Sequence, residues 1–153
     1  KRINYVHVET AQQMHTAVMQ QCTDADLFIA TAAVADYQPL NIDKQKIKKN
    51  EDLISMQLTR TPDILKEIKL SQPNLFCVGF AAETENLIEN AKTKLQNKSL
   101  NMIIANQVGL PNQGFDSDFN ALEIISHDSH VSLTLARKSD LARKVIKHIS
   151  DHL

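Results

Sequence analysis

Residues 74–108 decide the fold, and they read NLFCVGFAAETENLIENAKTKLQNKSLNMIIANQV. The stretch opens on an apolar run, NLFCVGFAAE, which is typical of a strand covered on both faces. Leu87, Ala91 and Leu95 then recur at the spacing of an amphipathic helix. A second apolar run, LNMIIANQV, predicts another buried strand. Strand, helix and strand in succession form a βαβ unit, so we expect the two strands to be parallel.

The same alternation extends outward from this unit. Thr10 and Thr61 are the expected N-caps of two further helices, and Pro62 suits a first helical position. The remaining expected elements are strands at 3–9, 26–34, 52–60, 121–126 and 131–136, and helices at 10–22, 61–72 and 138–153. These elements predict one α/β domain over residues 1–153, a Rossmann-like three-layer fold with a mostly parallel sheet and a C-terminal hairpin.

Composition narrows the function classes. The 153 residues carry a formal net charge of -1, which argues against a general nucleic-acid-binding protein. No apolar run approaches the roughly 20 residues that a membrane helix needs, so we expect no membrane partner and a cytoplasmic protein. Cys22 and Cys77 have no metal-binding or redox spacing and are expected to be buried thiols. His127 and His130 lie in a polar turn, and no pattern predicts a metal site.

Three predicted strand ends share small and polar residues, namely Ala30–Asp36, Gly79–Thr84 and Ala105–Asn106. In an open α/β sheet, ligands bind beyond the carboxyl ends of the strands. Asp36 is suited to accept hydrogen bonds from an amino group or a hydroxyl, and Phe80 offers a flat face to a planar ring. Each segment alone is better explained by tight helix packing or by a turn than by a ligand site. Three of them on one edge indicate a ligand site.

Cationic residues surround the same edge. Lys46, Lys48 and Lys49 follow in a predicted loop, where a charge run is usually a solvated face but also suits phosphate. Lys94 and Lys98 share one face of the helix that follows Phe80, where a polyanion between them would relieve their mutual repulsion.

The helix that starts at Pro62 adds free backbone amides, a ready anion site, with Asp63 beside it for another partner such as a sugar hydroxyl. Together with the lysines, these groups predict a nucleoside triphosphate. Neither common glycine-rich phosphate motif is present.

At these residues the chain resembles a known family. AAVADY, KIKK, TPDIL, VGFAAET and IIANQV…GFDSDFNAL, in this order and spacing, are similar to the phosphopantothenate–cysteine ligase domain of the bacterial bifunctional coenzyme A biosynthesis protein. The resemblance covers nearly the whole chain. It implies that CTP, with Mg²⁺, activates the carboxylate of 4′-phosphopantothenate as an acyl-cytidylate and releases pyrophosphate. The amine of cysteine then attacks this intermediate and releases CMP.

The resemblance also implies a set of residues that contact the nucleotide. By position in the motifs they are Ala30, Thr31, Ala32, Asp36, Lys46, Pro62, Asp63, Ile64, Leu65, Phe80, Lys94 and Lys98. Asn106 and Phe115 are expected nearby. The backbone of residues 30–32 and the side chain of Asp36 would contact the cytidine. Phe80 would line the base pocket, and Lys94 and Lys98 would hold the triphosphate. Lys46 would act on the phosphates or the developing charge, from a flap that closes to exclude water.

The family pattern usually starts with a strand, a glycine-rich turn and an asparagine-bearing loop that bind phosphopantothenate. None of these is in this sequence, so we expect an N-terminally incomplete domain that is inactive alone. The flavin-dependent decarboxylase half is expected as a fused or assembled partner, with no flavin in this segment. A homodimer is expected, with residues 52–60 or the hairpin around HDSH as candidate interface strands. A non-catalytic nucleotide-binding domain and an NAD-type dehydrogenase domain remain alternatives.

Overall fold

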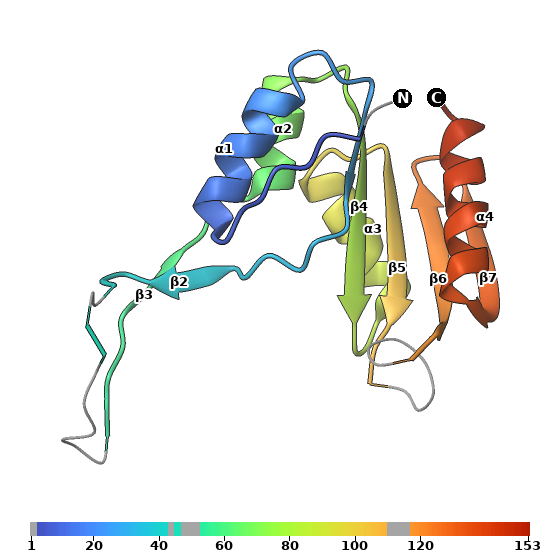
Figure 1. Cartoon of the computed structure of the whole chain (residues 1–153). Helices are drawn as coiled ribbons and strands as arrows, with labels where there is room; N and C mark the ends of the chain where they lie inside the picture. Colours follow the sequence, from blue (N-terminus) through green and yellow to red (C-terminus); the bar gives the residue numbers. More distant parts are fainter. Residues whose placement is uncertain (1–2, 43–44, 47–52, 110–116) are drawn as a thin grey trace.

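A computed structural model of the chain describes residues 3–42, 45–46, 53–109 and 117–153. Helices and strands alternate along most of this length (Figure 1). In chain order the elements are α1 (Ala11–Gln21), β1 (Leu27–Ala30), β2 (Tyr37–Pro39), β3 (Leu58–Arg60), α2 (Ile64–Ser71), β4 (Phe76–Glu83), α3 (Leu87–Asn97), β5 (Met102–Gln107), β6 (Phe119–Ser126), β7 (His130–Arg137) and α4 (Lys138–Ser150).

Five strands form one mixed sheet in the order β1-β4-β5-β6-β7. β1, β4 and β5 are parallel, with Ala30 opposite Gly79 and Gly79 opposite Ile103. β6 and β7 follow as an antiparallel hairpin, so β5 and β6 also run in opposite directions. The predicted βαβ unit, the α/β class and the C-terminal hairpin are confirmed.

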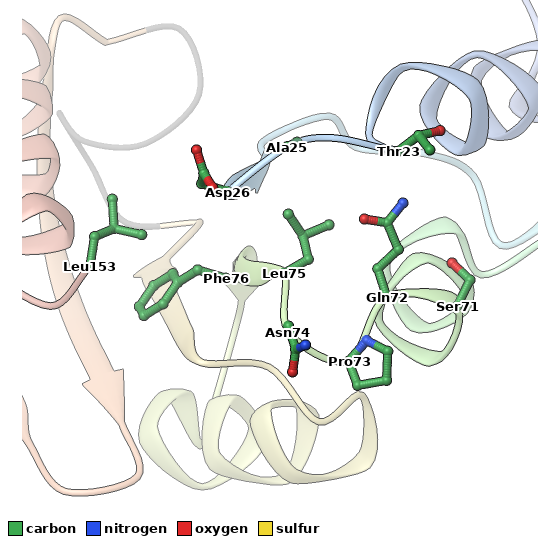
Figure 2. Close-up of a pocket in the computed structure, with 10 residues that line it drawn as sticks. All are labelled: Thr23, Ala25, Asp26, Ser71, Gln72, Pro73, Asn74, Leu75, Phe76 and Leu153. Atoms are coloured by element: carbon green, nitrogen blue, oxygen red, sulfur yellow. The ribbon is translucent and has the colours of Figure 1, made fainter.

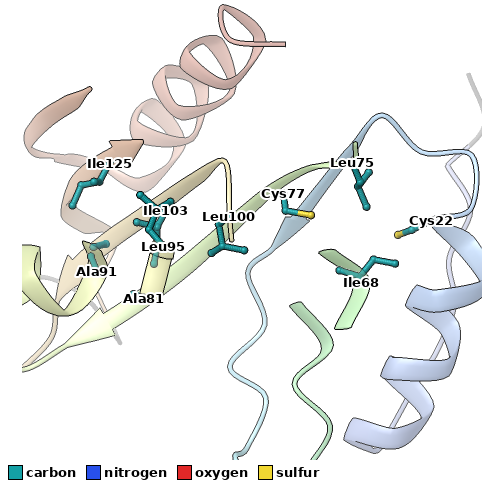
Figure 3. Close-up of a cluster of buried hydrophobic side chains, with 11 residues drawn as sticks. Cys22, Ile68, Leu75, Cys77, Ala81, Ala91, Leu95, Leu100, Ile103 and Ile125 are labelled. Atoms are coloured by element: carbon teal, nitrogen blue, oxygen red, sulfur yellow. The ribbon is translucent and has the colours of Figure 1, made fainter. Parts of the chain in front are cut away.

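Two apolar clusters cover the two faces of this sheet, which makes the fold three-layered. Because successive strand residues point to opposite faces, Cys77 and Val78 belong to different clusters. Figure 3 shows the cluster on one face, where side chains from α1, α2 and α3 meet the sheet. α4 covers the other face through Leu141, Val145 and Ile149, which pack with residues of β4, β5 and β6. Each fully buried aliphatic side chain in these clusters contributes about 1.5–3 kcal/mol to stability.

The two cysteines lie in the cluster on the α1–α3 face of the sheet. They are buried, as the sequence predicts. Both Cys22 and Cys77 are free thiols with buried side chains. Burial raises the pKa of each thiol, because the thiolate is poorly solvated inside the core. The thiols therefore stay protonated and serve as packing groups.

Three expected elements differ from the structure, and the first is the strand 26–34, because β1 already ends at Ala30. Residues 3–9 form no strand in the described chain, because no neighbouring segment there pairs with their backbone. The N-cap of α2 is Asp63 and not Thr61, so the helix begins two residues after Pro62. Thr61 instead donates its hydroxyl hydrogen to the carbonyl oxygen of Ala35, at 2.5 Å. The N-cap Thr10 is confirmed, because it forms a capping box with Gln13.

A two-stranded ribbon, β2 with β3, projects from the side of the main sheet (Figure 1). Tyr37 pairs with Arg60 and Pro39 with Leu58. The expected strand 52–60 is therefore confirmed only at its last three residues, Leu58–Arg60, and Asp52 lies outside the described residues. No helix in the described ranges is long and apolar enough to cross a membrane.

Candidate functional site

The carboxyl ends of the three parallel strands lie at one edge of the sheet. β1 ends at Ala30, β4 at Glu83 and β5 at Gln107. Val108 continues the pairing, because its backbone amide donates to the carbonyl oxygen of Glu83 at 2.9 Å. The segments that carry most of the predicted site residues leave the sheet from this edge or pack beside it.

The loop after β1 is fastened to the segment that precedes α2. The backbone amide of Thr61 donates to the carbonyl oxygen of Asp36 at 3.0 Å, and its hydroxyl donates to Ala35. Asp36 itself is exposed. These two bonds bring Asp36 next to Pro62 and Asp63, which the sequence alone separates by more than twenty residues.

Asp63 joins the start of α2 to the end of α3. Its Oδ1 atom accepts a hydrogen bond from the backbone amide of Lys66, at 3.2 Å, which caps the helix. The same atom accepts from the ammonium of Lys98 at 2.9 Å. The helix start was expected to offer its amides to an anion, and the chain's own carboxylate satisfies one of those amides. Ile64 is buried directly behind this cap.

Lys94, one turn earlier on α3, is held by a different carboxylate. Its ammonium donates to Oε1 of Glu83 at 2.6 Å. The other carboxylate oxygen, Oε2, accepts from the side-chain amide of Asn90 at 3.1 Å. Lys94 and Lys98 therefore share a helix face, as predicted, but each has an acidic partner that offsets their mutual repulsion.

Phe80 lies near the same edge but on the other face of β4. It has the strand parity of Val78, which packs in the α4 cluster, whereas Glu83 has the parity of Cys77 and Ala81, which pack on the α1–α3 face. The side chain of Phe80 is 38% exposed. A ligand that contacts both Phe80 and Lys94 must therefore cross the end of the sheet.

The remaining predicted residues are less constrained. Lys46 is exposed, in the segment between β2 and β3, and makes no hydrogen bond or ion pair with another described residue. Asn106 lies near the carboxyl end of β5, opposite Ala82 of β4. Lys48, Lys49 and Phe115 lie outside the described residues.

A hollow in the surface lies at the opposite, amino-terminal edge of the strands (Figure 2). Its lining residues come from the segments just before β1 and β4, from the end of α2 and from the end of the chain: Thr23, Ala25, Asp26, Ser71, Gln72, Pro73, Asn74, Leu75, Phe76 and Leu153. None of the described site candidates is among them. The expected site is thus an open edge rather than this hollow.

Across the part of the chain that the structure describes, no group of three or more histidine, cysteine, aspartate or glutamate side chains could hold a metal ion. Asp63 and Glu83 are both engaged by lysines. The exposed Asp36 is the predicted acidic residue whose carboxylate is not held by a lysine in this region.

Sequence reasoning missed two residues at this edge, Glu83 and Asn90. Glu83 belongs to the strand end that the sequence singles out, but an acid after a strand is also a common turn former. Asn90 precedes Lys94 by four positions, so both lie on one face of α3. That spacing, together with an acid at the preceding strand end, was the available signal.

Comparisons with known proteins converge on one family. The model of the DNA/pantothenate metabolism flavoprotein C-terminal domain matches residues 1–153. The coenzyme A biosynthesis bifunctional protein CoaBC of Vibrio cholerae is 40% identical over 154 residues, which are 99% of this chain and 39% of that protein. The chain therefore spans about two fifths of the length of this relative.

Solved structures give the same result. The crystal structure of the C-terminal domain of CoaBC superposes with a TM-score of 0.75 and 36% identity, over 94% of this chain and 63% of that one. A Cab2 mutant in complex with phosphopantothenate-cysteine superposes with a TM-score of 0.65 over 83% of this chain and 45% of that one. Its identity of 20% supports a shared fold alone.

Proposed function

Because this chain belongs to the family of DNA/pantothenate metabolism flavoprotein C-terminal domains, we propose that it is a ligase domain of coenzyme A biosynthesis. It joins 4′-phosphopantothenate to cysteine through an acyl-cytidylate made from CTP. The observation that carries the proposal is the edge where the loop after β1, the start of α2 and the lysine face of α3 are linked by direct contacts.

The base and sugar of CTP are assigned to the β1 side of this edge. The small residues Ala30, Thr31 and Ala32 allow close approach to backbone amides and carbonyls. Asp36 presents a carboxylate, which accepts hydrogen bonds from the cytosine amino group or from ribose hydroxyls. The partly exposed ring of Phe80 lies on the neighbouring strand and would pack against the planar base from the other side of the edge.

The triphosphate is assigned to the α2–α3 side. An ammonium has three donors, and the contacts with Glu83 and Asp63 use one donor of Lys94 and one of Lys98. The others are available to phosphate oxygens, where charge develops as pyrophosphate leaves. Pro62, Asp63, Ile64 and Leu65 form the helix start that faces these phosphates. When bound, Mg²⁺ supplies further charge neutralisation, held mainly by the phosphates as is usual for this ion.

We assign the catalytic role to Lys46, because the proposed roles of the other lysines, Lys94 and Lys98, are to bind the triphosphate. It lies on the β2–β3 segment, from which a flap can close over the nucleotide and exclude water from the acyl-cytidylate. Its ammonium would neutralise the two anions that carboxylate activation brings together.

A calorimetric titration tests the nucleotide assignment. We expect the protein with Mg²⁺ to bind CTP in preference to ATP and NADH, and Asp36→Ala to remove that binding. Asp128→Ala, an equally exposed acid in the β6–β7 turn, is the matched control and should bind CTP normally. A preference for NADH would contradict the proposal in favour of a dehydrogenase.

A second experiment separates a ligase from a non-catalytic nucleotide-binding domain. In the natural protein, pyrophosphate release should require both CTP and phosphopantothenate, and CMP release should require cysteine as well. CTP binding without pyrophosphate release would identify a non-catalytic domain.

We further propose a second activity in the natural protein, a flavin-dependent decarboxylase, since the relatives are bifunctional proteins. A cytoplasmic homodimer is proposed from the family resemblance of the sequence alone. For the dimer, the ribbon is the stronger of the two candidate surfaces. Tyr37, Met56 and Leu58 are all exposed apolar side chains there. Light scattering should find that Leu58→Glu is monomeric. If instead Leu135→Glu on β7 separates the subunits, the C-terminal hairpin is the interface.

A further inference from the structure

Glu83 differs from the other acids at the site edge because both of its carboxylate oxygens are bound by one helix. Oε1 accepts from Lys94 at 2.6 Å and Oε2 accepts from Asn90 at 3.1 Å. Its side chain is 13% exposed, although it stands at the end of a strand. The backbone of Glu83 is also fixed, since Val108 donates to its carbonyl oxygen. The carboxylate is therefore held rigidly from both ends.

Lys94 gains a defined position from this contact. Its side chain is 48% exposed, so without a partner the four-carbon stem would sample many rotamers. The contact with Glu83 uses one of the three ammonium donors and leaves the others facing solvent. An ammonium that is already oriented loses less conformational freedom when it binds a phosphate.

The neighbouring pair provides an internal comparison. Lys98 and Asp63 are 31% and 41% exposed, and the acid has a second task as the cap of α2. Glu83 has no capping task, and its other oxygen is held by Asn90 on the same helix as Lys94. Both side-chain contacts of Glu83 therefore go to α3, one to Lys94 and one to Asn90. Asn90 is itself held in place, because its amide also donates to the carbonyl oxygen of Glu85 at 3.1 Å.

From this geometry we propose that Glu83, held by Asn90, is a positioning residue that orients Lys94 toward the phosphates of the nucleotide. The inference rests on the proposed function only in assigning phosphate as the ligand of Lys94. Glu83 acts through the hydrogen bond and not through its charge, because a negative charge beside a polyphosphate opposes binding. A glutamine at this position can still accept from Lys94, whereas an alanine cannot.

The variants Glu83→Gln and Glu83→Ala separate these contributions. By calorimetry with CTP and Mg²⁺, Glu83→Ala should weaken binding about two- to tenfold, the cost of ordering one long side chain. Glu83→Gln should bind as well as the unmodified protein or more tightly. Glu89→Ala, an exposed acid on the same helix, is the matched control and should leave affinity unchanged. Equal affinities for all variants, or equal losses for the Gln and Ala variants, would overturn the proposal.

A double-mutant cycle removes the ambiguity of a general structural effect. In a Lys94→Met background, Glu83→Ala should have no further effect on CTP affinity, because its influence passes through Lys94. An undiminished effect in that background would show that Glu83 acts on the fold and not on the lysine.

A measurement without nucleotide keeps this inference separate from the proposed function. Nuclear magnetic resonance of the lysine ammonium groups should give Lys94 a higher order parameter than the exposed Lys92, and Glu83→Ala should remove the difference. If the protein binds no CTP but this result holds, the function proposal fails and the positioning contact stands. If the order parameter of Lys94 is unaffected by Glu83→Ala, the positioning proposal fails.

Discussion

The candidate site combines two regions that are built very differently. At the carboxyl end of β4, Lys94 stands on a helix that buries Ala91 and Leu95 in the core, and a nearly buried carboxylate holds its ammonium. On the β2–β3 side, Lys46 lies in the connection between two three-residue strands, and the ribbon that they form has exposed apolar side chains such as Leu58. The packed core thus orients the ammonium of Lys94. The described residues around Lys46, in contrast, are exposed and give its ammonium no such support.

This difference teaches how a nucleotide ligase can divide its tasks. Groups that bind the nucleotide benefit from being oriented in advance, since less freedom is lost on binding. A group that acts only during the reaction benefits from arriving when the substrates are bound and water is excluded. The exposed apolar side chains of the ribbon are then explained by a partner that covers them, which the dimer proposal supplies.

The sharpest way to break the comparison is the same substitution in both regions. Leu95→Ala on α3 removes a side chain that is 3% exposed, and it should lower the free energy of unfolding by about 2–5 kcal/mol. Leu58→Ala on the ribbon, where the side chain is 57% exposed, should change it by less than about 0.5 kcal/mol. Urea denaturation of a monomeric preparation measures both. Similar losses would mean that the ribbon is as well packed as the sheet.

The second prediction concerns chemistry. Lys46→Gln should lower kcat in the natural protein about a hundredfold, the effect of losing one group that stabilises transition-state charge. CTP affinity should change little, because the proposed function assigns the phosphates to Lys94 and Lys98. Lys92→Gln, an exposed lysine of α3, is the control. If Lys46→Gln mainly weakens CTP binding, the two regions do not divide binding from catalysis.

The third prediction tests how tightly the side chains around Gly79 of β4 are packed. A β-carbon on Gly79 would lie 2.8 Å from Cδ1 of Leu100 and 3.0 Å from Cδ2 of Leu65. Because Leu100 is buried, it cannot simply turn away, and Gly79→Ala should cost about 1–3 kcal/mol of stability. Adding Leu65→Val, which removes the second contact, should recover part of the loss. A neutral Gly79→Ala variant would show that the edge yields more easily than its contacts indicate.

The two regions also differ in how far the sequence predicts them. Residues 74–108 are assigned almost to the residue, because apolar runs and helical spacing depend on local chemistry and on one shared core. The ribbon is largely missed, since Tyr37–Pro39 forms a strand only through its pairing with Leu58–Arg60. The β-propensity of a three-residue segment is too weak to predict such a pairing.

The same limit applies to the site. The sequence predicts the lysine face of α3, because the spacing of Lys94 and Lys98 is a helical property. It does not predict the pairing of Lys94 with Glu83 or of Lys98 with Asp63, since both contacts join elements that only the tertiary fold brings together.

The smallest expected effect comes from the partly exposed pair of Asp63 and Lys98. Asp63→Asn should change the free energy of unfolding by less than about 1 kcal/mol, because solvent screens a pair that is 31% and 41% exposed and because asparagine also caps helices. Glu83→Gln should lower the free energy of unfolding by more in the same denaturation experiment. The carboxylate of Glu83 is only 13% exposed, so water has little access to the groups that lose a hydrogen-bond partner there. If Asp63→Asn proves the more damaging of the two, the rigid part of the edge is centred on the start of α2, and Lys98, rather than Lys94, is the lysine that the core orients.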